Sequence, residues 1–494
     1  MRARDVLIAG PAAALLVLLA YPGGAQAPAG ARSRPEATPP HQRASDPVWR
    51  LAAEDQKYAA IDGKHLMTYV DEITAISRKY RDNGHPQFWG RIIGSEADTE
   101  NAEWMLAKFR QFGLADVHEQ MFDLPPQWMP KSWNVAASSN GRNLALPTAQ
   151  PTYMAVGTPA AGLDLEAVYV GLGSEADINL AKPVKGKAVV FYSTDTASRH
   201  VGISDNAVKR LGDRGAAAIL IVPGLPGNIR TQFYPVNSPV PTFTLGQQDG
   251  LAMRDMIAAA AGEPVHVKIT LNVDRVPNLK TGTVWGTLPG VTDENVMIVA
   301  HRDGWFEGAN DDAAGMATMV GLAEFFSKIP KEQRRRTIIF LGTTGHHNNT
   351  AESGTWFAAN PETFAKTALL FNAEHTGLAD TGHNSNRPSD QPAAYNWYAG
   401  RTQQLADIVV NAMNSFGVPT GPQSSGSPPG EIGRFYQFAP SIEIINGGYV
   451  WHSDHEVSET LSPIGLGAVT RTYAKVINDT ASIPIADLRG PAAK

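Results

Sequence analysis

Four short apolar stretches, separated by long helical stretches, constrain the fold of this chain more than any other feature. They are Val296–Ala300, Thr337–Leu341, Ala368–Phe371 and Ile442–Ile445. Helical periodicity lies between them, most clearly from Ala313 to Ile329 and from Thr402 to Phe416. A strand that is apolar along its whole length is buried on both faces, which is typical of parallel sheets covered by helices. The sequence therefore predicts an α/β fold: a mostly parallel mixed sheet flanked by helices.

The first 27 residues have the three-part pattern of a signal peptide. Arg2 and Arg4 precede the apolar run Val6–Tyr21, and the small residues of Ala25–Ala27 follow it. The run is short for a membrane-spanning helix, although a retained anchor is the alternative interpretation. Residues 28–50 are rich in Pro, Ala and Ser, which favours a flexible tether. We expect an exported protein, periplasmic or secreted, with no membrane association after removal of the signal.

A smaller α/β unit is expected inside the main domain. Its β-branched runs, separated by Gly and Pro turns and a helix near residues 205–212, are Ala167–Val170, Lys187–Tyr192 and Ala218–Val222. Two helices precede it, one within residues 51–80 and one from about 98 to 112. The expected order is therefore signal peptide 1–27, tether 28–50, main domain 51–150, insert 151–275, second part of the main domain 276–485 and tail 486–494.

Charge and cysteine content exclude several classes of function. The 42 Lys and Arg residues against 48 Asp and Glu residues give a formal charge of -6, so no basic surplus is available for nucleic acid. The chain has no cysteine, which excludes disulfide scaffolds, thiol nucleophiles and cysteine-ligated metals. A metal site in this chain must use His and carboxylate ligands.

Such ligands follow the ends of all four predicted strands. His301 and Asp303 follow the first, with Asp311 at the start of the next helix, and the later ends carry His346-His347, Glu374-His375 and His452. Each group alone has a structural alternative: a helix cap for Asp311 or Asp312, a loop surface for the His pair, packing for Trp451-His452. Because binding sites in open α/β sheets form outside the carboxyl ends of the strands, the four groups together predict a metal site. Imidazole and carboxylate donors without sulfur suit zinc, with manganese or cobalt as alternatives.

The motif from Ala300-His-Arg-Asp-Gly-Trp to Gly308-Ala-Asn-Asp-Asp-Ala-Ala-Gly315 resembles the co-catalytic zinc aminopeptidase family. That family includes bacterial leucyl aminopeptidases, glutamate carboxypeptidase and the transferrin receptor. The insert resembles the protease-associated domain, most clearly at Val184–Val190 and Arg214–Pro223. The resemblance covers about residues 60 to 480 and implies a zinc exopeptidase-like sandwich fold.

The resemblance also implies a site with two zinc ions per chain. By position, Asp311 corresponds to the ligand that bridges the two ions, and His301 and Glu374 complete one of them. His347 and His452 would bind the other ion. Asp303 would hydrogen-bond His301 and orient it.

The chain departs from the family at one pair of residues. Active members usually carry two adjacent glutamates, the general base and a metal ligand, where this chain has His346-His347. Imidazole binds zinc well, so His347 remains an acceptable ligand. His346 would then be the base, since two nearby dications favour its neutral form. Glu352 is a weaker candidate for that role.

We therefore expect an exported exopeptidase, an aminopeptidase by resemblance, that hydrolyses peptide or amide bonds with metal-activated water. Its partner would be a peptide or small amide substrate. The alternatives are a catalytically degenerate binding protein with the peptidase fold and a hydrolase of a small non-peptide amide. Arg434, Phe435 and Tyr436 are candidates for the pocket wall, with simple packing as the alternative. Oligomeric state and side-chain specificity stay open.

Overall fold

The computed structural model describes residues 51–194, 203–347, 359–380, 391–434, 436 and 438–490. The predicted signal peptide and tether, Glu352, Phe435 and the last residues of the predicted tail lie outside this part of the chain. No helix within it has both the length and the apolar character needed to cross a membrane.

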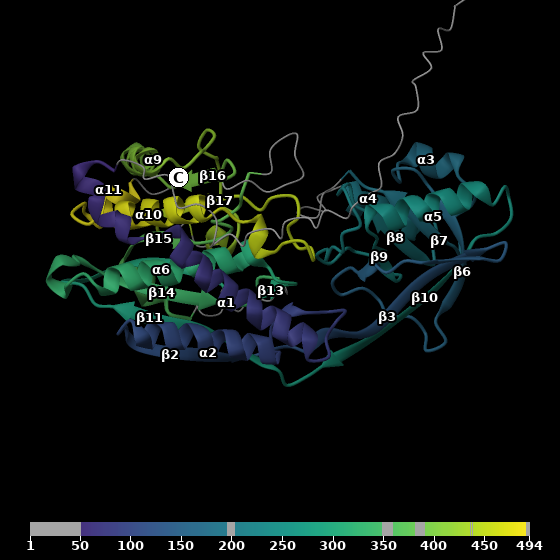
Figure 1. The fold of residues 1–494 in the computed structure, drawn as a ribbon, viewed down its shortest axis with the longest axis horizontal. Coiled ribbons are helices and arrows are strands. Elements are labelled where there is room, and N and C mark those ends of the chain that lie inside the picture. The colour runs from purple at the N-terminus through teal and green to yellow at the C-terminus, as the bar shows by residue number, and fades with distance from the viewer. Residues whose placement is uncertain are drawn as a thin grey trace, which may run out of the picture. The chain divides into compact units, whose positions relative to one another are not determined.

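The helices and strands of the described residues are drawn in Figure 1. The strands are β1 Gly90–Arg91, β2 Ala115–Asp123, β3 Gln127–Ser139, β4 Arg142–Ala145, β5 Gln150–Pro151, β6 Leu163–Tyr169, β7 Ala188–Tyr192, β8 Ala218–Val222, β9 Thr242–Thr244, β10 His266–Val276, β11 Lys280–Leu288, β12 Thr292–His301, β13 Gly304–Trp305, β14 Arg336–Thr343, β15 Thr367–Asn372, β16 Asn396–Ala399 and β17 Ser441–Ile445. The helices are η2 Ala53–Ala60, α1 Gly63–Asp82, α2 Glu96–Gln111, α3 Glu175–Leu180, α4 Ile203–Asp213, α5 Gln247–Ala259, η3 Ala309–Ala314, α6 Gly315–Ser327, η4 Lys331–Gln333, α8 Pro361–Ala365, α9 Gln403–Phe416, η5 Glu431–Arg434, η6 Ser458–Thr460, α10 Pro463–Asp479 and α11 Ile485–Arg489.

A seven-stranded sheet forms the centre of the main domain, in the order β16-β17-β15-β12-β14-β11-β2. The four predicted strands are its middle strands, and they run parallel to one another. The edge strand β16 pairs antiparallel with β17, and β11 pairs antiparallel with both β14 and β2. This arrangement confirms the predicted mixed, mostly parallel sheet.

Alternation of side chains explains why these strands are apolar along their whole length. In β12, Ile298 and Ala300 belong to the large core that α1, α2, α6, α9 and α10 build on one face of the sheet. Met297 and Val299 belong to a smaller core on the other face, together with Ile432 of η5. Both sets are almost fully buried, so a polar residue at either would lose its contact with water.

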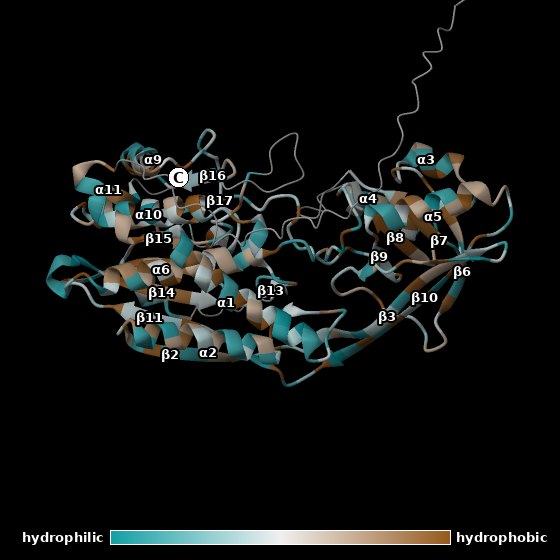
Figure 2. Ribbon diagram, viewed as in Figure 1, coloured by the Kyte–Doolittle hydropathy of each residue, from teal (hydrophilic) through white to brown (hydrophobic). Residues whose placement is uncertain are grey.

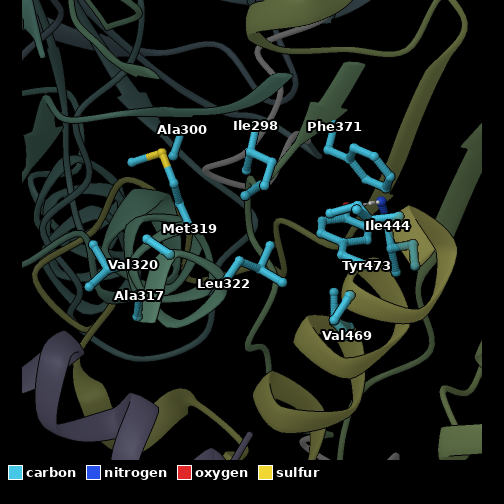
Figure 3. Close-up of a cluster of buried hydrophobic side chains, with 14 of the residues drawn as sticks. Ile298, Ala300, Ala317, Met319, Val320, Leu322, Phe371, Ile444, Val469 and Tyr473 are labelled. Atoms are coloured by element: carbon cyan, nitrogen blue, oxygen red, sulfur yellow. Dashed lines mark hydrogen bonds between the residues drawn. The ribbon is translucent and has the colours of Figure 1, made fainter. Parts of the chain in front are cut away.

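The packing of α6 against the sheet and α10 shows how the large core is closed (Figure 3). Met319 and Leu322 of α6 lie among the strands and Val469 of α10. Tyr473 places a hydroxyl in this core, and the hydroxyl finds hydrogen-bond partners there. It donates to the carbonyl of Asn372 at 2.8 Å and accepts from the amide of Ile444 at 2.9 Å. A buried aromatic side chain is thereby accommodated without an unpaired polar atom.

The second sheet has eight strands in the order β4-β3-β10-β6-β7-β8-β9-β5 and contains the three predicted strands of the insert. β7 and β8 are coloured as hydrophobic elements in Figure 2, and each has a core on both sides. β3 precedes residue 151 and pairs with β10 along almost its whole length, from Gln127 opposite Val276 to Ser138 opposite His266. The sheet thus takes in strands from before the expected start of the insert at residue 151, and that boundary stays a prediction.

Candidate metal centre

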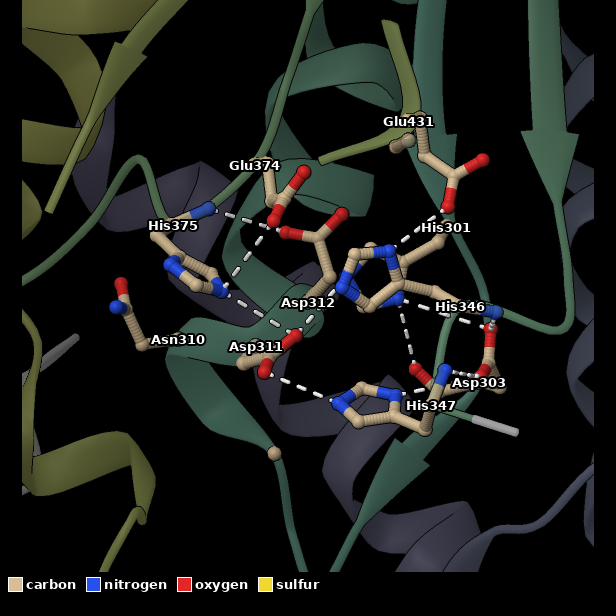
Figure 4. A network of polar contacts seen from close by, with 12 residues as sticks. His301, Asp303, Asn310, Asp311, Asp312, His346, His347, Glu374, His375 and Glu431 are labelled. Carbon is tan, nitrogen blue, oxygen red and sulfur yellow. Dashed lines mark hydrogen bonds and ion pairs between the residues drawn. The ribbon is translucent and has the colours of Figure 1, made fainter. Parts of the chain in front are cut away.

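Parallel strands bring the predicted site residues to one edge of the central sheet. β12 ends at His301, β14 leads to His346 and His347, β15 leads to Glu374, and β17 leads to the loop of His452. Because carboxyl ends of parallel strands meet at the same edge, groups far apart in sequence become neighbours. Figure 4 shows His301, His346, His347 and Glu374 gathered around Asp311, which lies in η3 and is joined to Asp312 by a cis peptide bond.

The loop between His301 and Asp311 is held by a buried arginine. Arg91 of β1 has no exposed surface, and its guanidinium donates to the carbonyls of Arg302 at 2.9 Å and Glu307 at 2.6 Å. A third donation reaches Gly308 at 3.2 Å. A planar group with several donors thus fixes the loop that carries the ligands.

The two carboxylate oxygens of Asp311 face different imidazoles. Oδ1 lies 2.9 Å from Nε2 of His301. Oδ2 lies 2.9 Å from Nε2 of His452 and 3.1 Å from Nε2 of His347. The indole nitrogen of Trp451 also donates to Oδ2. Asp311 therefore lies between His301 on one side and His347 and His452 on the other, and its role as a shared ligand stays a prediction.

Two donor sets follow from this geometry. The first donor set is Asp311 Oδ1, His301 and Glu374, and Glu374 lies close enough to His301 and His346 for their ligand atoms to fall within 4.8 Å of one another. The second donor set is Asp311 Oδ2, His347 and His452, whose ligand atoms meet the same limit. Every one of these side chains is buried.

The hydrogen bonding of the site fits a bound metal. Nε2 of His301 and Oδ1 of Asp311 are buried and, although they lie 2.9 Å apart, neither forms a hydrogen bond of good geometry with the other or with any other described residue. Orphaned polar atoms of this kind are rare in protein interiors, and a metal ion would satisfy them. Nitrogen and carboxylate donors without sulfur are the set that zinc accepts.

The protonation of the imidazoles depends on the surrounding carboxylates. Burial lowers the pKa of His452 to about 3, so this ring is neutral and ready to bind a metal. Burial also opposes protonation of His347, but the charges of Asp311 and Asp303 outweigh it and raise its pKa to about 9. A metal ion at His347 would replace that proton, because metal binding and protonation compete for the same nitrogen.

Asp303 lies in the site and contacts two histidines: the expected His301 through its backbone carbonyl, and His347 through its carboxylate. Nδ1 of His301 lies 3.0 Å from the backbone carbonyl of Asp303 and 3.7 Å from its carboxylate. The carboxylate instead accepts the amide of His347 at 2.8 Å and lies 3.2 Å from its Nδ1. Burial works against the charge of Asp303, yet His347 and His301 hold the pKa of this carboxyl well below its ordinary value.

His346 is paired with a residue that the sequence did not single out. Its Nδ1 lies 3.0 Å from Oε1 of Glu431, and its ring stacks on His301 with centroids 4.3 Å apart. Burial opposes protonation of His346, but Glu431 and the charge of Glu374 raise its pKa to about 10. Glu431 comes from η5, in a stretch rich in Pro, Gly and Ser without periodicity, so nothing in the sequence marks it.

Glu456 is a second residue that the sequence reasoning missed. Its two oxygens accept the backbone amides of Asp311 at 2.6 Å and of His452 at 2.7 Å. One buried carboxylate thus joins the loops of two predicted ligands from distant parts of the chain. Its position four residues after His452 was the available signal.

The connection between β8 and β9 of the second sheet also reaches the site. The amide of Gln232 donates to the carbonyl of His452 at 2.8 Å, and Thr231 forms a bridge with Ser453. The ring of Tyr234 lies 5.0 Å from that of His452 and 6.2 Å from that of His347. Tyr234 therefore covers the second donor set.

Of the three pocket-wall candidates, Tyr436 is the one whose side chain the structure describes. Tyr436 is exposed, and its carbonyl accepts a hydrogen bond from Arg401 at 2.7 Å. The side chain of Arg434 and all of Phe435 lie outside the described residues. Their role in a pocket stays a prediction.

Comparisons with known proteins match the segment that carries the site. Residues 283–477 match peptidase family M28. A probable glutamate carboxypeptidase from Zea mays is 23% identical over 315 residues, which are 53% of this chain and 41% of the maize protein. The match therefore spans less than half of that relative.

Solved structures share the fold. A zinc aminopeptidase from Bacillus subtilis has a TM-score of 0.62 at 17% identity, covering 85% of this chain and 95% of its own. A peptidase M28 precursor from Shewanella amazonensis has a TM-score of 0.66 at 18% identity, covering 87% of this chain and 97% of its own. The family match covers the segment that carries the site. On these grounds residues 283–477 carry a peptidase family M28 domain.

Proposed function

We propose that this protein is a metal-dependent exopeptidase, an aminopeptidase, that hydrolyses peptide or amide bonds. The observation that carries the proposal is the arrangement around Asp311, whose Oδ1 faces His301 and whose Oδ2 faces His347 and His452. Such an arrangement suits two zinc ions that share one carboxylate. When bound, the ions would polarise the scissile carbonyl and increase the acidity of water.

His346 would move the proton in this reaction. Glu431 holds Nδ1, and in Figure 4 the opposite edge of the ring faces the cluster of Asp311, Asp312 and Glu374. Nε2 would take a proton from the attacking water and return it to the leaving amine as the C–N bond breaks. The carboxylates that raise the pKa of His346 include Asp311 and Glu374, whose charge bound metal ions would offset.

The proposal extends to an exported location, which is supported by the sequence pattern of residues 1–27. The aminopeptidases and carboxypeptidase to which the chain is similar support a peptide substrate. The replacement of the usual glutamate pair by His346-His347 favours one second candidate, a binding protein that keeps the metal centre but has lost hydrolysis.

Metal content and turnover of the purified protein test the proposal together. We expect two zinc ions per chain by elemental analysis and hydrolysis of aminoacyl-anilides. The His346→Ala variant should keep both ions and lose activity by about 100-fold or more, the usual contribution of a general base. Two ions without turnover would support the binding protein, whereas a metal-free, inactive protein would contradict both candidates.

A further inference from the structure

His375 is a buried side chain at the metal centre, and the proposed function gives it no role. It follows Glu374 directly after β15, and only 1% of the residue is exposed. Both of its ring nitrogens are buried and have no hydrogen-bond partner among the described residues. A neutral imidazole left in this state is unfavourable, because one nitrogen loses a donor partner and the other an acceptor partner.

The backbone turns His375 toward the site. Successive residues of an extended strand point to opposite sides, so Glu374 and His375 would ordinarily diverge. His375 instead adopts a φ of 51°, in the left-handed region that only a few per cent of residues other than glycine occupy. This break in the alternation lets both side chains face Asp311 (Figure 4).

The ring nitrogen Nε2 of His375 points at the same oxygen as His301. Nε2 lies 3.3 Å from Oδ1 of Asp311 and 3.8 Å from Oε1 of Glu374. The ligand atoms of His301, Asp311 and His375 all lie within 4.8 Å of one another. The first donor set therefore has a further nitrogen beside it.

The surrounding residues hold this orientation. The ring packs at 72° against the indole of Trp451, with centroids 4.9 Å apart. On the Nδ1 side, a Cβ at Gly447 would stand 3.3 Å from Nδ1 and 3.0 Å from the Trp451 ring. Glycine at this position therefore leaves room for the imidazole between the loop and the site.

We infer that His375 is an additional ligand of the first metal ion, giving that ion the donors His301, Asp311 Oδ1, Glu374 and His375. The inference rests on the proposed metal centre and extends it. Four protein donors match the number that zinc prefers. The second donor set has only Asp311 Oδ2, His347 and His452, and keeps a position open for water or substrate.

The experiment is a titration of the metal-free, full-length protein with Co²⁺ and with Zn²⁺. Calorimetry monitors both titrations, and visible absorption also monitors the cobalt titration. Wild type is compared with His375→Ala and His375→Gln, and with His266→Ala as a matched control. His266 is exposed and pairs only with Asp164 among the described residues, so its loss should leave metal binding unchanged. Circular dichroism checks the fold of each variant.

We expect wild type to bind two ions and both His375 variants to bind one of them at least about 10-fold more weakly, with an altered cobalt spectrum. Glutamine has similar reach and can fill the space beside Trp451, so it separates ligation from packing. Two ions with wild-type affinity and spectrum in His375→Gln would overturn the inference. Metal binding by wild type without peptidase activity would refute the proposed function alone, and absence of metal binding would refute both.

Discussion

At the scale of single residues, the carboxylate of Glu431 controls the charge of His346. A base must be neutral to accept a proton, and the nearby negative charge of Glu431 helps to raise the pKa of His346. Removing that charge in Glu431→Gln lowers this pKa. We therefore expect the acidic limb of the kcat/KM profile to move to lower pH by about one unit.

The profile is measured with an aminoacyl-anilide at saturating metal. Glu332→Gln is a suitable control, because Glu332 is exposed on η4. An acidic limb that stays in place in Glu431→Gln would show that His346 is not the group that titrates. Asp303 and His347 would then need the same examination.

At the scale of elements, Glu324 joins α6 to α1. Its carboxylate accepts from the hydroxyl of Tyr69 at 2.8 Å and lies 2.8 Å from Nε2 of His65, both on α1. Burial works against its charge, but Lys328, Tyr69 and His65 lower its pKa to about 2, below the ordinary 4.5. Since the folded pKa is the lower one, the carboxylate stabilises the protein above about pH 4.5, and this stabilisation is lost as pH falls toward 2.

We expect Glu324→Gln to reduce the free energy of unfolding at pH 7 by about 1 kcal/mol, a value that allows for solvent screening of a partly exposed group. The difference from wild type should shrink as pH falls from about 4.5. Urea unfolding at several pH values measures it. A difference that is constant with pH would mean that the contact stabilises through shape and not through charge.

The segment of residues 230–234 is the second element whose contribution can be tested. Tyr234 covers His347 and His452 with its ring. In Tyr234→Ala, water and chelators should reach these ligands more easily, and zinc should be lost to a chelator several-fold faster. Tyr234→Phe keeps the ring and should behave like wild type. Equal rates in Tyr234→Ala and wild type would show that the segment does not protect the metal.

At the scale of the whole molecule, the metal centre is a buried concentration of charge. Asp311 is charged because His347, His375 and His301 overcome the effect of burial and hold its pKa well below the ordinary value. Burial and the charges of Glu374 and Asp311 raise the pKa of Asp312 well above its ordinary value. Metal ions would neutralise this cluster and bind only the folded chain.

We therefore expect metal removal to lower the unfolding temperature, and added Zn²⁺ to restore it. Each site adds about 2.7 kcal/mol of stability when free metal is 100 times its Kd. Differential scanning calorimetry of the metal-free and reconstituted protein measures the effect. Identical unfolding temperatures would indicate that the site binds no metal.

The strands of the central sheet and most of the site follow from local sequence. A run such as Val296–Ala300 is apolar throughout because both of its faces are buried, and that requirement is visible in one short segment. His301, Glu374 and His452 were found because parallel strands bring their carboxyl ends together. Residue type and position after a strand were enough to select them.

Other parts of the site depend on contacts between distant segments. Glu431 contacts His346, Glu456 accepts from the amides of Asp311 and His452, and Tyr234 comes from the connection between β8 and β9. None of these contacts is encoded in the periodicity of its own segment. The carboxylate of Asp303 accepts from the amide of His347 at 2.8 Å but lies 3.7 Å from Nδ1 of His301, and only the folded loop sets these distances.

By itself, therefore, the sequence determined the class of fold, the parallel middle of its sheet and the chemical nature of the donors, since burial patterns and strand ends are local properties. Only the tertiary structure decided how the donors divide between the two oxygens of Asp311, which carboxylate orients which histidine, and that His375 turns inward. Those features depend on distances between segments far apart in the chain, and a single φ of 51° at His375 is enough to change which side chain faces the metal centre.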